Sequence, residues 1–429
     1  MAKDSDIAPR LTPVQIGALV AGNALEFYDF LVYSFFAISI GRTFFPSNHP
    51  ESSLLLALAT FGAGFLTRPV GSIVIGLIAN RAGRKPAMML AFALMGVSIL
   101  GLACTPSYAR IGIAAPLLAI LWRLIQGFAL GGEVGPATAL LAEATTPQRR
   151  GLFCAFQIST QQIAITCVGI IGFCLSGTIS SQALDSWGWR VALMAGIIVV
   201  PVGLIVRATL PETLHQPDSI AQAAPETVRT LSLWRLVALT FVILASTTVG
   251  TYVLNTLTTY AVATLKMPAQ TGFAATLVRG AAGAAFALAA GGWSDRVGRR
   301  LPMIAATLLS TVLTLPLFML IVATRSSAAL LTTSALLGAC VAIASAPIIT
   351  VMAEALPARI RAGTTGMTYA FAISVFGGST PFVVTWLTGV THNPLTPAWY
   401  LVVASAAGLI ALLILPETAP LERTSRDQQ

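Results

Sequence analysis

Long apolar runs follow one another along the chain, separated by short polar segments. A helix needs about 20 residues to cross the roughly 30 Å hydrocarbon core of a bilayer, and twelve runs approach or exceed that length. Their predicted boundaries are 14–40, 52–79, 86–104, 112–142, 152–178, 189–209, 234–264, 271–292, 302–323, 328–354, 364–390 and 397–415. The short alternating segments of a membrane β-barrel do not occur. The pattern predicts an all-α membrane protein with twelve transmembrane helices.

The composition excludes a water-soluble protein of this size. The chain has 429 residues, of which 56% are hydrophobic and only 10% charged, and its mean hydropathy is +0.82. Soluble domains carry about 25% charged residues. The net charge of +9 does not indicate a nucleic-acid partner, because the basic residues are scattered in small loop clusters. The predicted partner is the lipid bilayer.

The distribution of lysine and arginine predicts the orientation. Three arginines lie inside helices, five basic residues fall on one side, and seventeen fall on the side that holds both termini. Those seventeen are Lys3, Arg10, Arg81, Arg84, Lys85, Arg149, Arg150, Arg207, Arg229, Arg235, Arg296, Arg299, Arg300, Arg359, Arg361, Arg423 and Arg426. The five are Arg42, Arg110, Arg190, Lys266 and Arg325. By the positive-inside rule, we expect a multi-pass protein of the cell inner membrane with cytoplasmic termini.

The chain repeats itself in two halves. The segment Gly76–Lys85 recurs as Gly291–Arg300, and Leu210–Thr213 recurs as Leu415–Thr418. A third landmark, Glu143 followed by Pro, Arg and Gly, recurs at Glu354 in the same order. Landmarks that recur in the same order, at offsets of 215, 211 and 205 residues, indicate an internal duplication. The predicted units are an N-terminal six-helix bundle (1–209), a cytoplasmic linker (210–231), a C-terminal six-helix bundle (232–415) and a cytoplasmic tail (416–429).

The two matching loops carry a resemblance. Their pattern of glycine, aspartate or asparagine, arginine, glycine and two basic residues resembles the signature of the major facilitator superfamily. The resemblance implies two pseudo-symmetric bundles that rock around a substrate held between them. It also implies a conformational latch formed by Asn80, Arg81, Arg84, Asp295, Arg296 and Arg299. Asn80 departs from the usual aspartate, which predicts a weaker latch in the first copy; alternatively, the basic turns only fix the topology.

A narrower resemblance covers nearly the whole chain. The stretches Gly22–Tyr33, Gly64–Gly71 and Arg123–Glu133 together resemble the metabolite:proton symporters, which include carriers of citrate, 2-oxoglutarate, shikimate and proline or betaine. The stretches Ser159–Ile165 and Phe376–Pro381 are similar to the citrate and tricarballylate branch. The resemblance implies a symporter that imports a small organic polyanion, best matched by citrate or a related tricarboxylate, by alternating access. Another carboxylate, a zwitterion, or a proton-coupled efflux antiporter are the alternatives.

Charged residues inside the predicted spans are the candidate functional groups. A charge near the bilayer centre costs at least about 2.5–3.5 kcal/mol on insertion scales, so each one needs a partner or a role. Six such residues are present: Glu26, Asp29, Arg68, Arg123, Glu133 and Arg279.

The first span carries a polar stripe. Asn23, Glu26, Asp29 and Tyr33 are spaced three or four residues apart, so they share one face of a helix. Two neighbouring carboxylates in a low dielectric cannot both ionise cheaply, which suits them to hold a proton. We expect Glu26 and Asp29, with Glu133, to carry the coupling proton. The alternative is that Asp29 permanently neutralises Arg68.

The fourth span offers an anchor for an anion. Arg123 and Gln126 lie one turn apart, and arginine presents a planar fork that matches a carboxylate. Arg123 is therefore expected to bind substrate, with a static ion pair as the alternative. The other predicted substrate ligands are Asn23, Gln126, Gln161, Gln162, Arg279, Tyr369 and Thr380. For each of them, a structural bond between helices remains the alternative, and for Arg279 the alternative is charge balance between the halves. The pair Gly377 and Gly378, just before Pro381, is expected to break the eleventh helix and expose backbone groups at the site.

No enzyme motif accompanies these residues. The spacings H-E-x-x-H, G-x-S-x-G and the phosphate-binding loop do not occur in the sequence, so no enzymatic activity is expected. We expect neither a cofactor nor a metal, and the predicted coupling ion is the proton, with sodium left open. Duplicated halves favour a carrier over a channel. Because each chain holds both halves, it is expected to work as a monomer.

Overall fold

The computed structural model describes residues 13–82, 84–131, 145–197, 201, 232–355 and 358–419. The helices of the first half are α1 (Pro13–Phe35), α2 (Ala37–Phe44), α3 (Pro50–Leu66), α4 (Arg68–Ala82), α5 (Arg84–Cys104), α6 (Tyr108–Ile111), α7 (Ala114–Leu130), η1 (Pro147–Arg149), α9 (Arg150–Thr178), α10 (Ser181–Ala183), η2 (Leu184–Gly188) and α11 (Trp189–Ile197). Those of the second half are α14 (Leu233–Asn255), α15 (Leu257–Ala263), α16 (Ala269–Val297), α17 (Arg300–Thr324), α18 (Ser327–Ala355), α19 (Ala358–Ala372), η3 (Ile373–Gly377), α20 (Gly378–Thr391) and α21 (Thr396–Ile414).

Each of the twelve predicted runs contains a described helix. In the described part of the chain, eight helices are long and apolar enough to cross a membrane, and the bent pair α1 and α2 adds a ninth. Two shorter apolar helices, Met89–Cys104 and Ala114–Leu130, fall on the third and fourth runs. The predicted linker 210–231 and the end of the tail, 420–429, lie outside the described residues, as do parts of the fourth and sixth runs.

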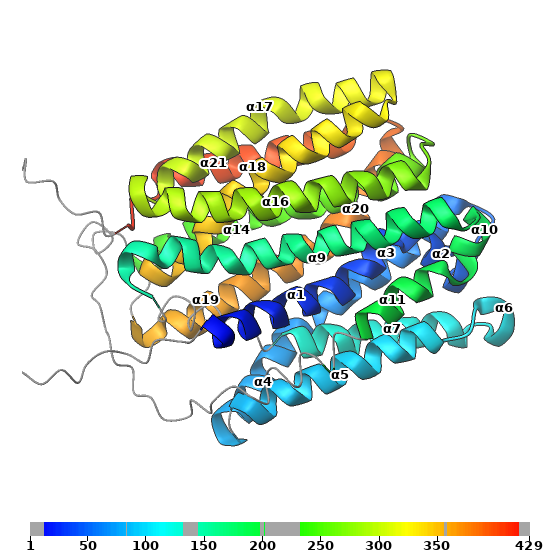
Figure 1. Ribbon diagram of the computed structural model, residues 1–429, viewed down its shortest axis with the longest axis horizontal. Coiled ribbons are helices and arrows are strands. Elements are labelled where there is room, and N and C mark those ends of the chain that lie inside the picture. The colour runs from blue at the N-terminus through cyan, green and yellow to red at the C-terminus, as the bar shows by residue number, and fades with distance from the viewer. Residues whose placement is uncertain are drawn as a thin grey trace, which may run out of the picture.

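The long helices run side by side along one axis, and the two sequence halves occupy different regions of the bundle (Figure 1). Helix α9 of the first half packs along α16 of the second, and α3 packs against α20. Small residues allow the close approach: a Cβ added to Gly172 would lie 2.1 Å from Cδ1 of Phe273. These two helix pairs form the boundary between the halves.

The first span is bent, which the sequence pattern did not predict. Residues Gly22–Phe35 of α1 and Ala37–Phe44 of α2 meet at 64°. The short helix α2 completes the span. It packs against α3 and against η2, so the bend seats it on two neighbouring elements.

The prediction that Gly377 and Gly378 break the eleventh span is wrong. The span Thr364–Thr391 is continuous, and a π-helical turn, η3, replaces the break. A π turn accommodates one extra residue without interrupting the backbone bonds. Gly378 instead lies at a close contact between the halves. A Cβ added to it would lie 3.0 Å from Cβ of Phe65, and a Cβ added to Gly62 of α3 would lie 2.7 Å from the Gly378 carbonyl oxygen.

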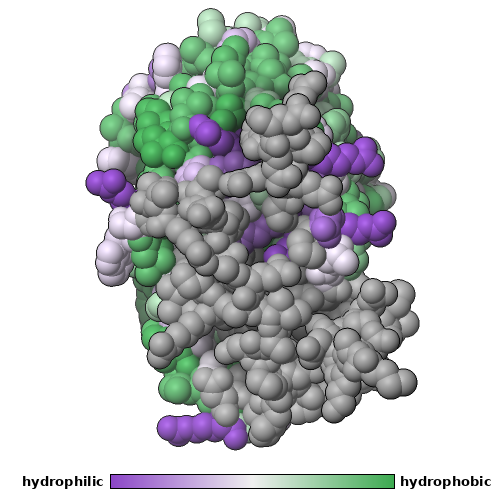
Figure 2. Space-filling view, turned by 90° about the vertical axis from the view of Figure 1, so that its left-hand side faces the viewer, coloured by the Kyte–Doolittle hydropathy of each residue, from purple (hydrophilic) through white to green (hydrophobic). Residues whose placement is uncertain are grey.

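The outer surface matches a bilayer. Large apolar side chains such as Leu66, Ile73 and Val403 are exposed along the helices, far more than a soluble protein shows. Figure 2 looks onto one end of the bundle: green apolar side chains form the flanks, and purple hydrophilic side chains gather on the end face. The molecule is a multi-pass membrane protein.

Candidate functional site

A cavity of about 60 Å³ lies between the two halves. It is lined from both sides, by α1 and α9 of the first half and by α14, α18, α19 and η3 of the second. Its polar lining includes three predicted substrate ligands, Gln161, Gln162 and Tyr369, and also Thr251 and Asn255. Ligand sites usually have about 300–1,000 Å³. The halves have therefore closed around the predicted site.

Arg123 lies beside this cavity in an aromatic cage. Its side chain is 0% exposed, and its guanidinium sits over the rings of Phe30, Tyr33 and Phe61 at 4.5, 4.6 and 5.1 Å. One nitrogen, Nη1, donates to Oε1 of Gln126, as the spacing of these two residues predicts. The Nε and Nη2 atoms have no hydrogen-bond partner within the described ranges. The cage holds the charge by cation–π attraction and leaves two donors free.

Arg68 occupies the same aromatic cage. It begins α4, is buried, and lies over the rings of Phe30 and Phe65 at 4.7 and 4.5 Å. Phe30 therefore contacts the guanidinium groups of both Arg68 and Arg123. Among the described residues, neither arginine makes an ion pair with a carboxylate. In the described part of the chain, these two buried positive charges contact aromatic rings and, for Arg123, the amide oxygen of Gln126.

Asp29 does not neutralise Arg68 in this structure. Asp29 is fully buried, and neither of its carboxylate oxygens has a hydrogen-bond partner in the part of the chain that is described. It faces α11, where a Cβ added to Gly196 would lie 1.8 Å from Oδ1. The neighbouring Tyr28 donates its hydroxyl to the Ala192 carbonyl of the same helix at 2.8 Å. Asp29 thus lies between the first and sixth spans, apart from the arginines.

Arg279 is a buried cation inside a membrane span of the second half. It lies on α16, is 1% exposed, and donates through Nη1 to Oδ1 of Asn255 and through Nη2 to the Thr251 carbonyl at 3.3 Å. Both acceptors also line the central cavity. The guanidinium therefore has neutral partners at the edge of the cavity, and its Nε is unpartnered in the described structure.

Tyr252 lies between the aromatic cage and the central cavity, and it was not among the predicted site residues. Its ring packs on Phe61 and Phe65 at centroid distances of 6.3 and 5.7 Å, and it also lines the cavity. Arg68, Arg123 and Arg279 all lie near it. An aromatic wall thus separates the cavity from the two arginines of the first half. An aromatic residue within an apolar run gave no sequence signal for this position.

The remaining predicted ligands are placed differently. Asn23 donates to the Gln157 carbonyl and to Oγ1 of Thr160, both at 3.0 Å, so it bonds α1 to α9 as the structural alternative predicts. Thr380 is fully buried but does not line the cavity. The side chain of Glu26 and the whole of Glu133 lie outside the described residues.

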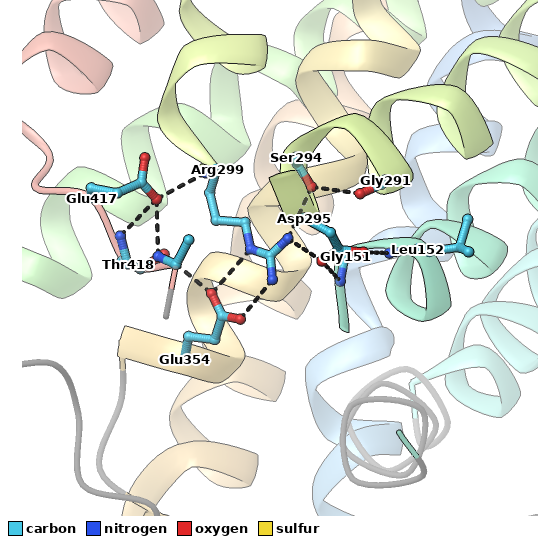
Figure 3. Close-up of polar contacts among 10 residues, drawn as sticks. Gly151, Leu152, Gly291, Ser294, Asp295, Arg299, Glu354, Glu417 and Thr418 are labelled. Carbon is cyan, nitrogen blue, oxygen red and sulfur yellow. Dashed lines mark hydrogen bonds and ion pairs between the residues drawn. The ribbon is translucent and has the colours of Figure 1, made fainter. Parts of the chain in front are cut away.

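The second predicted latch loop forms a buried charge network (Figure 3). Arg299 is 1% exposed and pairs with Glu354 at 2.9 Å and with Asp295 at 2.5 Å. Burial lowers the pKa of Arg299, but its hydrogen bonds and its attraction to the two carboxylates outweigh burial, so the pKa is raised. Asp295 also accepts from the backbone N–H groups of Gly151 and Leu152, at 2.8 and 2.9 Å. Since these open α9, Asp295 binds the first half to the second.

Glu417 extends the network and was not among the predicted site residues. It accepts from the backbone N–H groups of Arg299 and Arg300, at 2.8 and 3.0 Å, and so caps the start of α17. The repeated landmarks at Glu354 and Leu415–Thr418 were the signal for both acidic residues. Of the other predicted latch residues, Arg81 and Arg296 are exposed, and the side chains of Asn80 and Arg84 lie outside the part of the chain that the structure describes.

Comparisons with known proteins agree with this arrangement. The sugar (and other) transporter model matches residues 14–224, and the major facilitator superfamily model matches 239–429. A citrate–proton symporter of Salmonella typhi is 34% identical over 92% of each chain. The α-ketoglutarate permease of Escherichia coli is 32% identical over 96% of each chain.

A solved structure supports the fold. The xylose transporter of E. coli, in a partially occluded inward-open conformation, superposes with a TM-score of 0.74 at 19% identity, covering 94% of this chain and 98% of its own. This likeness confirms the predicted fold of twelve transmembrane helices in two six-helix bundles. The chain belongs to the major facilitator superfamily and, within it, to the metabolite:proton symporters, the group that contains the citrate–proton symporters.

Proposed function

We propose that the protein is a proton-coupled symporter that imports a small organic polyanion, with citrate or a related tricarboxylate as the best candidate. The relatives named citrate–proton symporter, at 34% and 32% identity, support the substrate class. The observation that carries the proposal is the pair Arg68 and Arg123, buried in one aromatic cage without a carboxylate in the described structure.

The buried arginines favour an anionic substrate. A guanidinium taken out of water without a counter-ion is costly, and a bound carboxylate would remove that cost. The free Nε and Nη2 donors of Arg123 suit a two-point contact with one carboxylate. To reach them from the cavity, the substrate must displace the aromatic wall at Tyr252, so binding and rearrangement of the wall are linked.

The other polar groups of the cavity complete the proposed site. Gln161, Gln162 and Tyr369 lie where a second or third carboxylate would contact them, and Arg279 with Asn255 closes the site from the second half. Gln126 orients Arg123. Substrate contacts from both halves would allow each half to sense the same ligand, as alternating access requires.

Asp29 is the proposed proton carrier. A fully buried carboxylate with no hydrogen-bond partner in the described residues is stable only when protonated. Because it lies between α1 and α11, its ionisation would disturb the packing of these helices directly. Glu26 and Glu133 remain candidates for a second proton site. The proposed membrane is the cell inner membrane, with both termini in the cytoplasm, and the proposed unit is a monomer that performs no enzymatic reaction and needs no cofactor or metal.

A dicarboxylate is the second candidate substrate. The α-ketoglutarate permease is 32% identical to this chain, close to the value for the citrate symporters. A zwitterion such as proline or betaine fits less well, because it brings no net negative charge to the buried arginines. The number of carboxylates is therefore the property to measure.

The test is uptake of radiolabelled citrate into proteoliposomes, with an inward pH gradient imposed and then collapsed. Unlabelled tricarballylate, 2-oxoglutarate, shikimate and betaine serve as competitors. We expect accumulation that disappears with the gradient and competition that follows negative charge. Asp29→Asn should abolish gradient-driven accumulation but retain citrate counterflow. The control is Asp185→Asn, in η2, which should retain both. Uptake that is indifferent to the gradient would refute proton coupling, and preference for betaine would refute the polyanion.

A further inference from the structure

A second, larger cavity lies wholly in the first half. It measures about 600 Å³ and is lined by the end of α2, the connection from α5 to α6, and the segment from α10 to α11. These elements lie at the end of the bundle opposite α19 and the free end of α4 (Figure 1). No residue lines both this cavity and the central one. It is therefore separate from the proposed transport site.

The cavity is strongly basic. Arg42, Arg110 and Arg190 line it, against one carboxylate, Asp185. These three are three of the five basic residues that the sequence places on the non-cytoplasmic side. Hydroxyl and amide groups of Thr105, Ser107, Gln182 and Ser186 complete the polar wall. The positive-inside rule does not explain arginines gathered on this side.

The three arginines have different partners. Arg42 pairs with Asp185, which also accepts from the Ser39 hydroxyl at 2.7 Å, so this pair is neutral and fixed to α2. Arg190 donates to the carbonyls of Ala103, Thr105 and Ser186 at 3.0, 2.9 and 2.6 Å. The carbonyls and the Trp189 ring, at 4.3 Å, fix the Arg190 guanidinium in place, and no carboxylate among the described residues pairs with it.

Arg110 is the free charge of the cavity. Its side chain is exposed and makes no hydrogen bond or ion pair within the described ranges, and it lies near Arg190. Two like charges held close together repel each other unless an anion lies between them. With Arg42 neutralised, the cavity carries an excess of two positive charges, one held by carbonyls and one exposed.

We propose that this outer cavity binds a small oxyanion with two or more negative charges, such as a di- or tricarboxylate or phosphate, between Arg110 and Arg190. Its volume lies within the usual range for a ligand site, about 300–1,000 Å³, and arginine is the residue that best matches carboxylate and phosphate oxygens. The free anion in solution is the proposed ligand. The phosphate of a lipid headgroup has the same chemistry, and the experiment distinguishes the two.

Cys104 provides a direct reporter, because it is exposed and lines the cavity. The protein is reconstituted in nanodiscs of zwitterionic lipid, with the exposed Cys167 and Cys174 replaced by serine. Labelling rates of Cys104 are measured with an anionic and a cationic methanethiosulfonate, each normalised to a small free thiol. We expect the anionic reagent to be favoured about tenfold at low ionic strength and the preference to shrink at high salt.

Substitutions and ligands then test the site itself. Arg110→Gln should remove most of the preference, whereas the matched control Arg325→Gln, exposed on the same side but in the second half, should leave it. Citrate and inorganic phosphate should slow labelling of the parent but not of Arg110→Gln, and glycerol should slow neither. Equal rates for the two reagents, or no protection by either anion, would overturn the proposal. Protection only by anionic lipid would assign the cavity to a headgroup and also overturn it. None of these readouts depends on transport.

Discussion

Arg123 and Arg299 are both completely buried, yet their surroundings are opposite. Arg299, between α16 and α17 at one end of the bundle, contacts two carboxylates and a serine hydroxyl. Arg123, in the middle of the first half, contacts three aromatic rings and one amide oxygen. Two equally buried arginines thus differ in their partners: Arg299 is paired with carboxylates, and Arg123 has no carboxylate partner in the described structure.

The difference separates a structural cation from a functional one. Removing one partner of a buried ion pair is strongly destabilising, which makes Arg299 part of the scaffold. Replacing Arg123 would leave no carboxylate without its partner, because no carboxylate in the described structure pairs with Arg123. A buried arginine with free donors is poised to receive an anion from outside. Burial alone would not have distinguished the two roles.

The largest expected effect is on stability, at the charge network around Arg299. Arg299→Met leaves Glu354 and Asp295 buried without their cation, and we expect the free energy of unfolding to fall by about 3–5 kcal/mol. Thermal and denaturant unfolding in detergent, followed by circular dichroism, measures the loss. The exposed neighbour is the control: Arg296→Met should change the value by no more than about 0.5 kcal/mol. An Arg299→Met protein as stable as its parent would show that Arg299 is not a structural cation.

Replacing Arg123 should have the opposite result: it should lower transport and leave stability unchanged. Truncating one partner of a buried charged contact costs about 2–5 kcal/mol, so Arg123→Gln should lower citrate uptake by about thirtyfold or more. Its melting temperature should stay the same or rise, because an uncompensated charge is removed. Arg325→Gln, which removes an exposed charge, serves as the control in the same proteoliposome assay. Loss of folding in Arg123→Gln would show that this arginine is structural after all.

Arg279 is the intermediate case, since its partners are neutral. Hydrogen bonds to a charged group are worth about 1.5–3 kcal/mol, so Arg279→Gln should raise the KM for citrate by about tenfold to a hundredfold. Asn255→Asp sharpens the comparison, because it gives Arg279 a carboxylate like those of Arg299. We expect this variant to be stable and to transport poorly although the arginine is still present. Normal uptake by Asn255→Asp would argue against substrate binding at Arg279.

The smallest expected effect concerns the contact that Asp295 makes across the halves. A carboxylate at a helix N-terminus contributes about 0.3–1 kcal/mol, and up to about 2 kcal/mol when partly buried. Arg299 keeps its ion pair with Glu354 in Asp295→Asn, and the asparagine amide oxygen can still accept one of the two N–H groups, so the protein should stay folded. We expect a shift of a few fold toward the state in which the halves are apart at this end, reported by spin-label distances between the start of α9 and the end of α16. The exposed Glu51→Gln is the matched control, and an unchanged distance distribution in Asp295→Asn would show that the contact does not hold the halves.

Periodicity and buried charge predicted most of the fold and part of the site. Apolar runs and repeated loops depend on local sequence, so the spans, the duplication and the contact between Arg123 and Gln126 could be found from the chain alone. The pairs that form across helices could not. Whether Asp29 faces Arg68 or Gly196 depends on how the first span is rotated, and a residue spacing of three or four does not fix that rotation.

Aromatic and backbone features also escaped prediction, for a related reason. Tyr252 and Phe30 lie within apolar runs where any large residue would suit the lipid, so only the folded structure shows that they surround cations. Gly377 and Gly378 suggested a broken helix, whereas the structure uses a glycine here to bring two helices together. A glycine in a membrane helix permits either outcome, and the neighbouring helix decides between them.

The contacts at both ends of the bundle have a consequence for cell energetics. The halves meet through Asp295 and α9 at one end and through Phe36 and Phe273, at a ring separation of 4.8 Å, at the other. The cavity between these contacts measures about 60 Å³, well below the usual size of a ligand site. A carrier with contacts at both ends and so little space between them would insulate the membrane and dissipate little of the proton-motive force between transport cycles.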